Sequence, residues 1–302
     1  MAIFPWTIAD LACRPASMHD GRMIPWTPLP AVALTSRRPR GRRRTASGRW
    51  RRRAQWLRRS FGAAPRPLRI GSIAAAALAL FAATNLVYQV VRKPTEMFYP
   101  VAGALDKRPG ETWEEYGPLF REHATAAIPA ELLAALAQVE GAGNPLARTY
   151  WRWQFTWRPF AIYAPASSAV GMYQMTDPAF ADARGFCVRD HVVTDDCWFS
   201  GLYSRVLPSH AIELAAVYLD RRVAAILAQQ PRTKPTAQQR QDLAALIHLC
   251  GTGPAKTFAR RGFHLAPGQR CGDHDAARYL ASVNALKQQF QQLAATMDSR
   301  SD

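Results

Sequence analysis

The sequence predicts a mainly α-helical domain that follows a single N-terminal transmembrane helix. Residues 70–91 form a long apolar run without a charged side chain. From residue 111 onward, apolar residues recur at helical spacing, and no run shows the alternation of a half-buried strand. Hydrophobic residues make up 48% of the chain, which excludes a fully disordered or fibrous protein.

The positive charge is concentrated at the N-terminus. The 302 residues include 39 Lys or Arg and 22 Asp or Glu, a net charge of +17. Residues 1–69 alone hold 16 Arg, no Lys and two acidic residues. Since a block of like charges repels itself, residues 1–69 are predicted to be a disordered arm, with the start codon left open between Met1 and later methionines. Such an arm with interleaved Trp permits nucleic-acid binding, but the rest of the chain is nearly neutral and we expect no nucleic-acid partner.

Residues 70–91 are predicted to be an uncleaved membrane anchor. A helix of this length spans roughly 33 Å, enough for a hydrocarbon core of about 30 Å. A buried core helix is the alternative, but the run has no polar stripe. A cleaved signal peptide would need a much shorter N-terminal region. Because the Arg-rich side stays cytoplasmic, the chain is expected to be a single-pass inner-membrane protein with residues 94–302 in the periplasm.

The predicted elements of the remaining chain follow local start and stop signals. Residues 92–110 are predicted to be a linker. Pro129 and Asp177-Pro178 mark helix starts, and Gly251-Thr-Gly-Pro254 marks a helix end. Arg148–Pro165 is predicted to be an irregular aromatic insertion. Helices are predicted over Thr112–Thr125, Pro129–Glu140, Asp177–Arg184, Ser209–Gln229, Thr236–Cys250 and a final segment that includes Leu280 to Leu293.

Four of the five cysteines lie in the predicted periplasmic part. An even set in an oxidising compartment is typical of disulfides, most simply Cys187–Cys197 and Cys250–Cys271. The alternative is a zinc site that uses histidines near the second pair, but those spacings match no tight Cys-x-x-Cys pattern. We therefore expect no metal and no other cofactor.

Glu140 is the candidate catalytic residue. It ends an apolar helical stripe that includes Leu133, Leu136 and Ala137. Partial burial there disfavours the charged carboxylate, so the group is expected to be able to act as a general acid. The alternative is that Glu140 only solvates a helix end. A carboxylate at a helix C-terminus is electrostatically unfavourable, which makes the purely structural reading the weaker one.

Two motifs accompany this glutamate. Glu140-Gly-Ala-Gly-Asn144-Pro is followed by Ser168-Ala-Val-Gly171-Met-Tyr173-Gln174-Met-Thr176. The pattern resembles the catalytic core of lytic transglycosylases of the lysozyme-like superfamily, and the resemblance covers residues 111–297. It implies a lysozyme-like helical domain that cleaves peptidoglycan glycan strands.

The resemblance also implies roles for individual residues. In the family, the glutamate protonates the glycosidic oxygen between N-acetylmuramic acid and N-acetylglucosamine. It then acts as a base while the C6 hydroxyl of the muramic acid closes a 1,6-anhydro ring. Glu140 takes this role by position. The residues then expected to contact the substrate are Gly171, Tyr173, Gln174, His248 and Tyr279.

The chain departs from the family pattern at four positions. Gly141 stands where Ser is usual, and Tyr173 where Met is usual. In the later motif His248 replaces Tyr, and Leu249 replaces Asn. These departures leave open a non-catalytic peptidoglycan-binding protein on the same scaffold.

The aromatic insertion allows two interpretations. Trp151 and Trp153 are expected to stack on sugar rings as part of the substrate site. Clusters of Trp and Tyr also occur at membrane interfaces, which is the alternative.

The number of acidic residues favours one reaction type. Hydrolytic glycosidases need two carboxylates at the cleaved bond, and the motifs provide no second one. Asp177 is expected to cap a helix, and Asp195 and Asp196 to lie in a disulfide loop. The sequence therefore predicts anhydro-forming cleavage, with a hydrolytic lysozyme-type muramidase as the alternative.

Overall fold

The structure is a computed structural model that describes residues 46–98, 102–198, 200–230 and 234–301. The chain divides into two units, residues 1–66 and 67–302. In the first unit, Ala46–Ala63 form helix α1. This corrects the prediction of a disordered arm for these residues, because Arg, Ala and Leu have high helix propensities that can offset like-charge repulsion. Residues 1–45, with Cys13 and the candidate start codons, lie outside the described residues.

The second unit begins with helix α2, Arg66–Arg92. It is the helix among the described residues that is long and apolar enough to cross a membrane. Its most apolar window has a mean hydropathy of 1.9, and 6% of that window is buried. The helix extends beyond the predicted span, residues 70–91, at both ends.

The segment after α2 is packed, which corrects the prediction of a linker over residues 92–110. It forms the short 3-10 helices η1 (Pro94–Phe98) and η2 (Ala102–Leu105). The side chain of Glu96 is fully buried. It accepts a hydrogen bond from Trp151 Nε1 at 2.7 Å and pairs with Arg148 and Lys93, each at 3.2 Å. A buried carboxylate needs such partners, and they hold this segment against the residues that follow.

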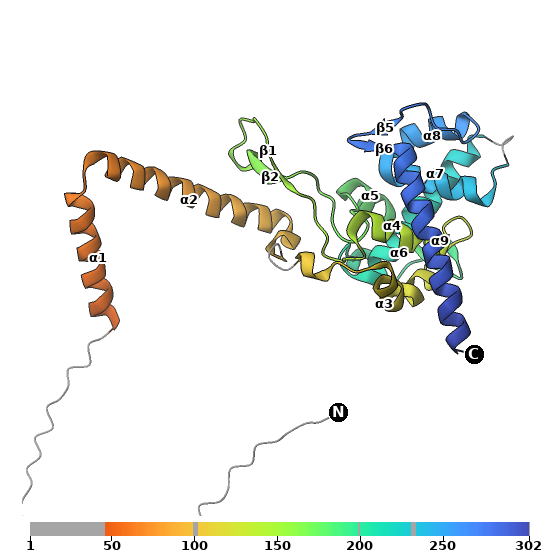
Figure 1. Ribbon diagram of the computed structural model, residues 1–302, viewed down its shortest axis with the longest axis horizontal. Coiled ribbons are helices and arrows are strands. Elements are labelled where there is room, and N and C mark those ends of the chain that lie inside the picture. The colour runs from red at the N-terminus through yellow and green to blue at the C-terminus, as the bar shows by residue number, and fades with distance from the viewer. Residues whose placement is uncertain (1–45, 99–101, 199, 231–233, 302) are drawn as a thin grey trace, which may run out of the picture. The chain divides into compact units, whose positions relative to one another are not determined.

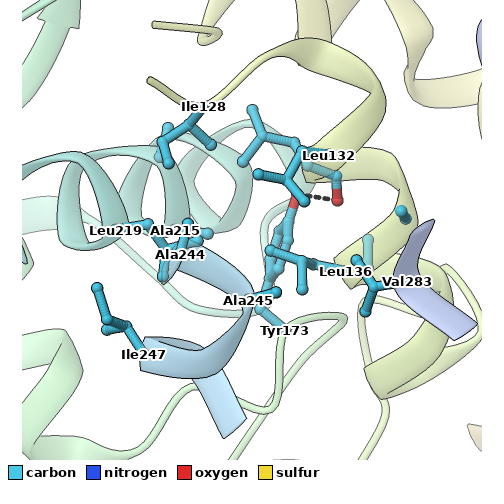
Figure 2. Close-up of a cluster of buried hydrophobic side chains, with 14 of the residues drawn as sticks. Ile128, Leu132, Leu136, Tyr173, Ala215, Leu219, Ala244, Ala245, Ile247 and Val283 are labelled. Atoms are coloured by element: carbon cyan, nitrogen blue, oxygen red, sulfur yellow. Dashed lines mark hydrogen bonds between the residues drawn. The ribbon is translucent and has the colours of Figure 1, made fainter. Parts of the chain in front are cut away.

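The body of the second unit is mainly helical (Figure 1). Helix α4 lies against α3, α6 and α9, and α7 contacts α6, α8 and α9. Apolar side chains from α4, α6, α7 and α9 meet in one core, part of which Figure 2 shows. The helices are α3 (Pro109–Glu122), α4 (Ala130–Gly141), α5 (Asp177–Ala183), α6 (Pro208–Ala228), α7 (Ala237–Cys250), α8 (Thr252–Arg260) and α9 (Ala276–Ser301).

Six of these helices confirm the sequence predictions to within a few residues. Thr236, the first residue of the predicted helix, caps α7 and forms a capping box with Gln239. Helix α8 was not predicted, because Gly251-Thr-Gly-Pro254 was interpreted only as a stop. Gly251, at φ 74°, does end α7, but α8 begins at the next residue. Pro254 fits there because the first turn of a helix needs no N–H from it.

Short hairpins interrupt the helices. They pair β1 (Trp151–Trp153) with β2 (Tyr163–Pro165), β3 (Cys187–Arg189) with β4 (Val192–Thr194), and β5 (Arg270–Cys271) with β6 (His274–Asp275), all antiparallel. Two further 3-10 helices are η3 (Pro159–Ala161) and η4 (Ser200–Leu202). The hairpins were not predicted, since strands of two or three residues are too short to show alternation.

Both predicted disulfide pairings are confirmed. Cys187 and Cys197 are bonded, and so are Cys250 and Cys271. The second bond joins the last residue of α7 to β5.

Candidate active site

Glu140 lies in the last turn of α4, at the edge of the core. Leu133, Leu136 and Ala137, which precede it on the helix, are fully buried, whereas the Glu140 side chain is 20% exposed. The helix ends because Ala142 adopts a left-handed conformation, with φ 49°. The carboxyl group is therefore supported by apolar packing on one side and reachable from solvent on the other.

Tyr279 holds this carboxyl group in place. Its hydroxyl, on the first turn of α9, donates a hydrogen bond of 2.6 Å to Glu140 Oε1. Burial raises the pKa of Tyr279 well above its ordinary value, and the charge of Glu140 and this hydrogen bond raise it further. The hydroxyl therefore stays protonated near neutral pH and remains a donor.

His248 is the third member of the cluster. Its Nε2 lies 3.6 Å from Glu140 Oε1, and its side chain is 12% exposed. The three residues come from α4, α7 and α9, so the helical packing brings together positions that are far apart in the sequence. This placement agrees with the expectation that Glu140, His248 and Tyr279 belong to one site.

A cavity of about 340 Å³ adjoins the cluster. It includes two carboxylates, Asp273 and Asp275, that the sequence analysis missed. Asp275 Oδ1 accepts a hydrogen bond from the Arg278 backbone and so caps α9. Asp273 is exposed. The lining residues are Val139, Glu140, Leu249, Asp273, His274, Asp275, Arg278, Tyr279 and Ser282.

No second carboxylate was found in the motifs, and Asp273 and Asp275, which line the cavity, lie outside those motifs. The predicted disulfide between Cys250 and Cys271 could have revealed these two residues. Cys250 follows His248 by two residues and is bonded to Cys271, so Asp273 has to lie near the end of α7.

The motif loop after Ser168 packs against the end of α4 through Gly141. A Cβ atom on Gly141 would lie 2.9 Å from both Cα and the carbonyl oxygen of Met172. Such distances are not tolerated, so any larger residue would push the loop away. This contact explains why the residue after Glu140 is a glycine.

Tyr173 and Gly171 have structural roles, which corrects their assignment as substrate contacts. Tyr173 is 1% exposed and its hydroxyl donates to the Leu133 carbonyl at 3.1 Å, inside the core shown in Figure 2. Gly171 has φ 79°, and a Cβ atom there would collide with the Arg205 carbonyl oxygen. Its backbone approaches Arg205, so the absence of a side chain serves packing.

Gln174 also turns back onto its own loop. The residue has φ 44°, and its Nε2 donates to the Gly171 carbonyl at 3.0 Å. It does not line the cavity beside Glu140. Its expected contact with substrate is not part of this arrangement.

Trp151 and Trp153 lie on β1 and do not line this cavity either. The indole N–H of Trp151 donates a hydrogen bond to Glu96. The Trp153 side chain is 73% exposed. The structure thus separates the aromatic insertion from the Glu140 cluster, contrary to the expectation that both form one site.

The residues considered for zinc are arranged differently from a metal site. Cys250 and Cys271 are bonded to each other. Among the residues that the structure describes, no three His, Cys, Asp or Glu side chains are grouped so as to hold a metal ion.

Comparison with known proteins gives no family assignment. No family model matches the chain, and no curated protein is significantly similar to it.

Proposed function

We propose that the protein is a membrane-anchored peptidoglycan lytic transglycosylase with a lysozyme-like domain and Glu140 as its acid and base. The observation that supports this most strongly is the Glu140 carboxyl group, fixed by Tyr279 at the edge of the core beside a 340 Å³ cavity. The motifs around Glu140 are the second support.

In this mechanism Glu140 protonates the glycosidic oxygen between N-acetylmuramic acid and N-acetylglucosamine, and the bond to C1 of the muramic acid breaks. The Glu140 carboxylate then takes the proton of the C6 hydroxyl, whose oxygen attacks C1. The glutamate ends as it began, and no water is consumed. Tyr279 keeps the carboxyl group oriented through both proton transfers.

Asp273 and Asp275 support a second candidate function, hydrolytic muramidase activity. Both line the same cavity as Glu140. A second carboxylate can activate a water molecule or form a covalent intermediate. Because Asp275 already caps α9, Asp273 is the candidate for that role.

The test is mass analysis of the fragments that the full-length protein in detergent releases from peptidoglycan sacculi. We expect products one water lighter than hydrolytic fragments. Glu140→Gln keeps the shape of the side chain but removes the transferable proton, so the rate should fall by about 10²–10⁴-fold. Asp273→Asn is the control and should retain most of the activity.

The other outcomes are distinct. Hydrated products together with an inactive Asp273→Asn variant would establish the muramidase. A wild-type protein that binds sacculi but releases nothing would establish a non-catalytic binding protein on this scaffold.

The proposed location is the inner membrane. In this arrangement α2 crosses the bilayer once, the Arg-rich N-terminal side stays in the cytoplasm, and the body lies in the periplasm beside the glycan strands. The length and hydropathy of α2 support the single crossing, and the two disulfides support a body outside the cytoplasm.

A further inference from the structure

The β1–β2 hairpin carries a group of aromatic side chains that pack against little of the protein. Phe155 and Trp157 are as exposed as in an extended chain, at 110% and 103%, and Trp153 is 73% exposed. Large apolar side chains gathered at one exposed place mark an interaction surface. The question is which partner this surface meets.

The hairpin is joined to the C-terminal part of α2. Asn85 Nδ2 donates to the Tyr163 carbonyl at 2.8 Å, and Gln89 Nε2 donates to the Phe160 carbonyl at 2.6 Å. Tyr88 stacks on Phe160 with ring centroids 4.7 Å apart. Asn85 and Gln89 are the buried residues of α2, at 3% and 7% exposure, so these two polar side chains serve this contact.

These contacts fix the level of the hairpin along α2. At a rise of about 1.5 Å per residue, Gln89 lies about 5 Å and Asn85 about 10 Å before the helix end at Arg92. If α2 spans the bilayer with residues 70–91, its last turn, with Gln89, lies where the hydrocarbon core meets the lipid headgroups, and Asn85 lies about one turn deeper. Trp and Tyr side chains are enriched in that layer.

The charged residues around the hairpin suit the same layer. Arg92 and Arg158 line a second cavity, of about 770 Å³, near the end of α2 and the hairpin, whereas the charge of Lys93, which also lines it, is paired with Glu96. Arg152 is exposed on β1. Exposed aromatic side chains together with nearby cations are the combination that binds a lipid surface, since the cations attract anionic headgroups.

We propose that the β1–β2 hairpin is a second membrane anchor, which inserts Trp153, Phe155 and Trp157 into the interfacial layer of the leaflet from which α2 emerges. The proposal rests on the α2 anchor of the proposed function. A lipid surface is the partner rather than a glycan strand, because the hairpin is bound to α2 and does not line the Glu140 cavity. The body is thereby attached to the membrane at two points.

The experiment uses full-length protein carrying Cys13→Ser, reconstituted in vesicles of phosphatidylethanolamine and phosphatidylglycerol. An environment-sensitive fluorophore is attached to a new cysteine in Phe155→Cys or, separately, Trp157→Cys. Both native side chains are almost fully exposed, so their replacement removes few internal contacts. Nitroxide-labelled lipids then report contact with the bilayer by quenching the fluorophore.

Two controls accompany these variants. Val192→Cys labels another solvent-exposed apolar position, 65% exposed, on the β3–β4 hairpin. Leu80→Cys labels the middle of α2, where the side chain is 69% exposed. We expect a blue-shifted emission and strong lipid quenching at 155, 157 and 80, and a red emission without quenching at 192.

Quenching at 80 without quenching at 155 and 157 would overturn the second anchor while leaving the α2 anchor in place. Absence of quenching at all four positions would overturn both. If the labels at 155 and 157 respond to soluble peptidoglycan fragments but not to labelled lipid, the surface binds glycan and the proposal is wrong.

Discussion

At the scale of single residues, burial decides which aromatic side chains belong to the site. Tyr173 and Tyr279 were both expected to contact substrate, and both have hydroxyl groups with buried surroundings. Tyr173 points into the core and donates to Leu133, whereas Tyr279 donates to Glu140 beside the cavity. The sequence could not separate the two, because the difference depends on how α4 packs against α9.

Tyr279→Phe tests the positioning role. The change removes the hydrogen bond to Glu140 and leaves the ring in place. Hydrogen bonds to charged groups are worth about 1.5–3 kcal/mol, so we expect kcat to fall by roughly 10- to 100-fold with little change in KM. Steady-state release of soluble fragments from sacculi measures this. A KM increase with unchanged kcat would instead make Tyr279 a substrate-binding residue.

His123 gives the body a predictable sensitivity to acid. Burial lowers its pKa, although Glu213 and Glu122 oppose the shift, and His210 adds to it. In the unfolded chain His123 has its ordinary pKa of about 6.5. Below that pH the unfolded state binds a proton that the folded state binds less readily, so the free energy of unfolding falls as pH decreases.

Each unit by which the pKa is lowered corresponds to about 1.4 kcal/mol of lost stability at low pH. Urea unfolding at about pH 7.5 and about pH 5 measures the loss. His123→Gln, which can still bond to Ser209, should show a smaller decrease between the two pH values than the wild type. An equal decrease in both proteins would assign the acid sensitivity to other groups.

At the scale of elements, the helices with local end signals were predictable and the contacts between elements were not. Local signals give the starts of three helices to within a few residues, at Pro129, Asp177-Pro178 and Thr236. The arrangement of Asp273 beside Glu140 depends on the disulfide and on α7, α9 and the β5–β6 hairpin together. Of these features the sequence predicts only the disulfide pairing, and that pairing was not used to place Asp273.

Gly141→Ser tests the close contact between α4 and the motif loop. The new side chain would meet the Met172 backbone, so we expect a loss of about 1–3 kcal/mol in the free energy of unfolding. Gly110→Ser is the matched control, because nothing lies within 4 Å of a Cβ atom there. In helix α3 that change should be neutral or slightly stabilising. Equal stability of the two variants in urea would show that the motif loop shifts to admit the larger side chain with little loss of stability.

At the scale of the whole molecule, the sequence predicted a membrane helix followed by a helical body, and the structure has a helix long and apolar enough to cross a membrane and a mainly helical body. The prediction succeeded because a long uncharged run and a helical period are strong signals. It failed for residues 92–110, since the burial of Glu96 depends on Arg148 and Trp151, some 50 residues further along. The contacts of α2 with the β1–β2 hairpin could not be predicted for the same reason.

The orientation of the chain is tested with a reporter fused after Asp302. The Arg-rich flank should stay in the cytoplasm, so an enzyme that is active only in the periplasm should work in this fusion. A fluorescent protein that matures only in the cytoplasm should remain dark. A bright cytoplasmic reporter would contradict the proposed location.

In the proposed periplasmic location, the bond between Cys250 and Cys271 links the chemistry of the cavity to the timing of export. It joins the end of α7, beside His248, to the hairpin that carries Asp273. While a newly made chain is still in a reducing cytoplasm, these cysteines are thiols and nothing covalent holds that wall of the cavity. Oxidation after translocation closes a 21-residue separation. If the body is exported as proposed, the wall next to Glu140 is secured only in the compartment that holds the proposed substrate, and this oxidation is a maturation step.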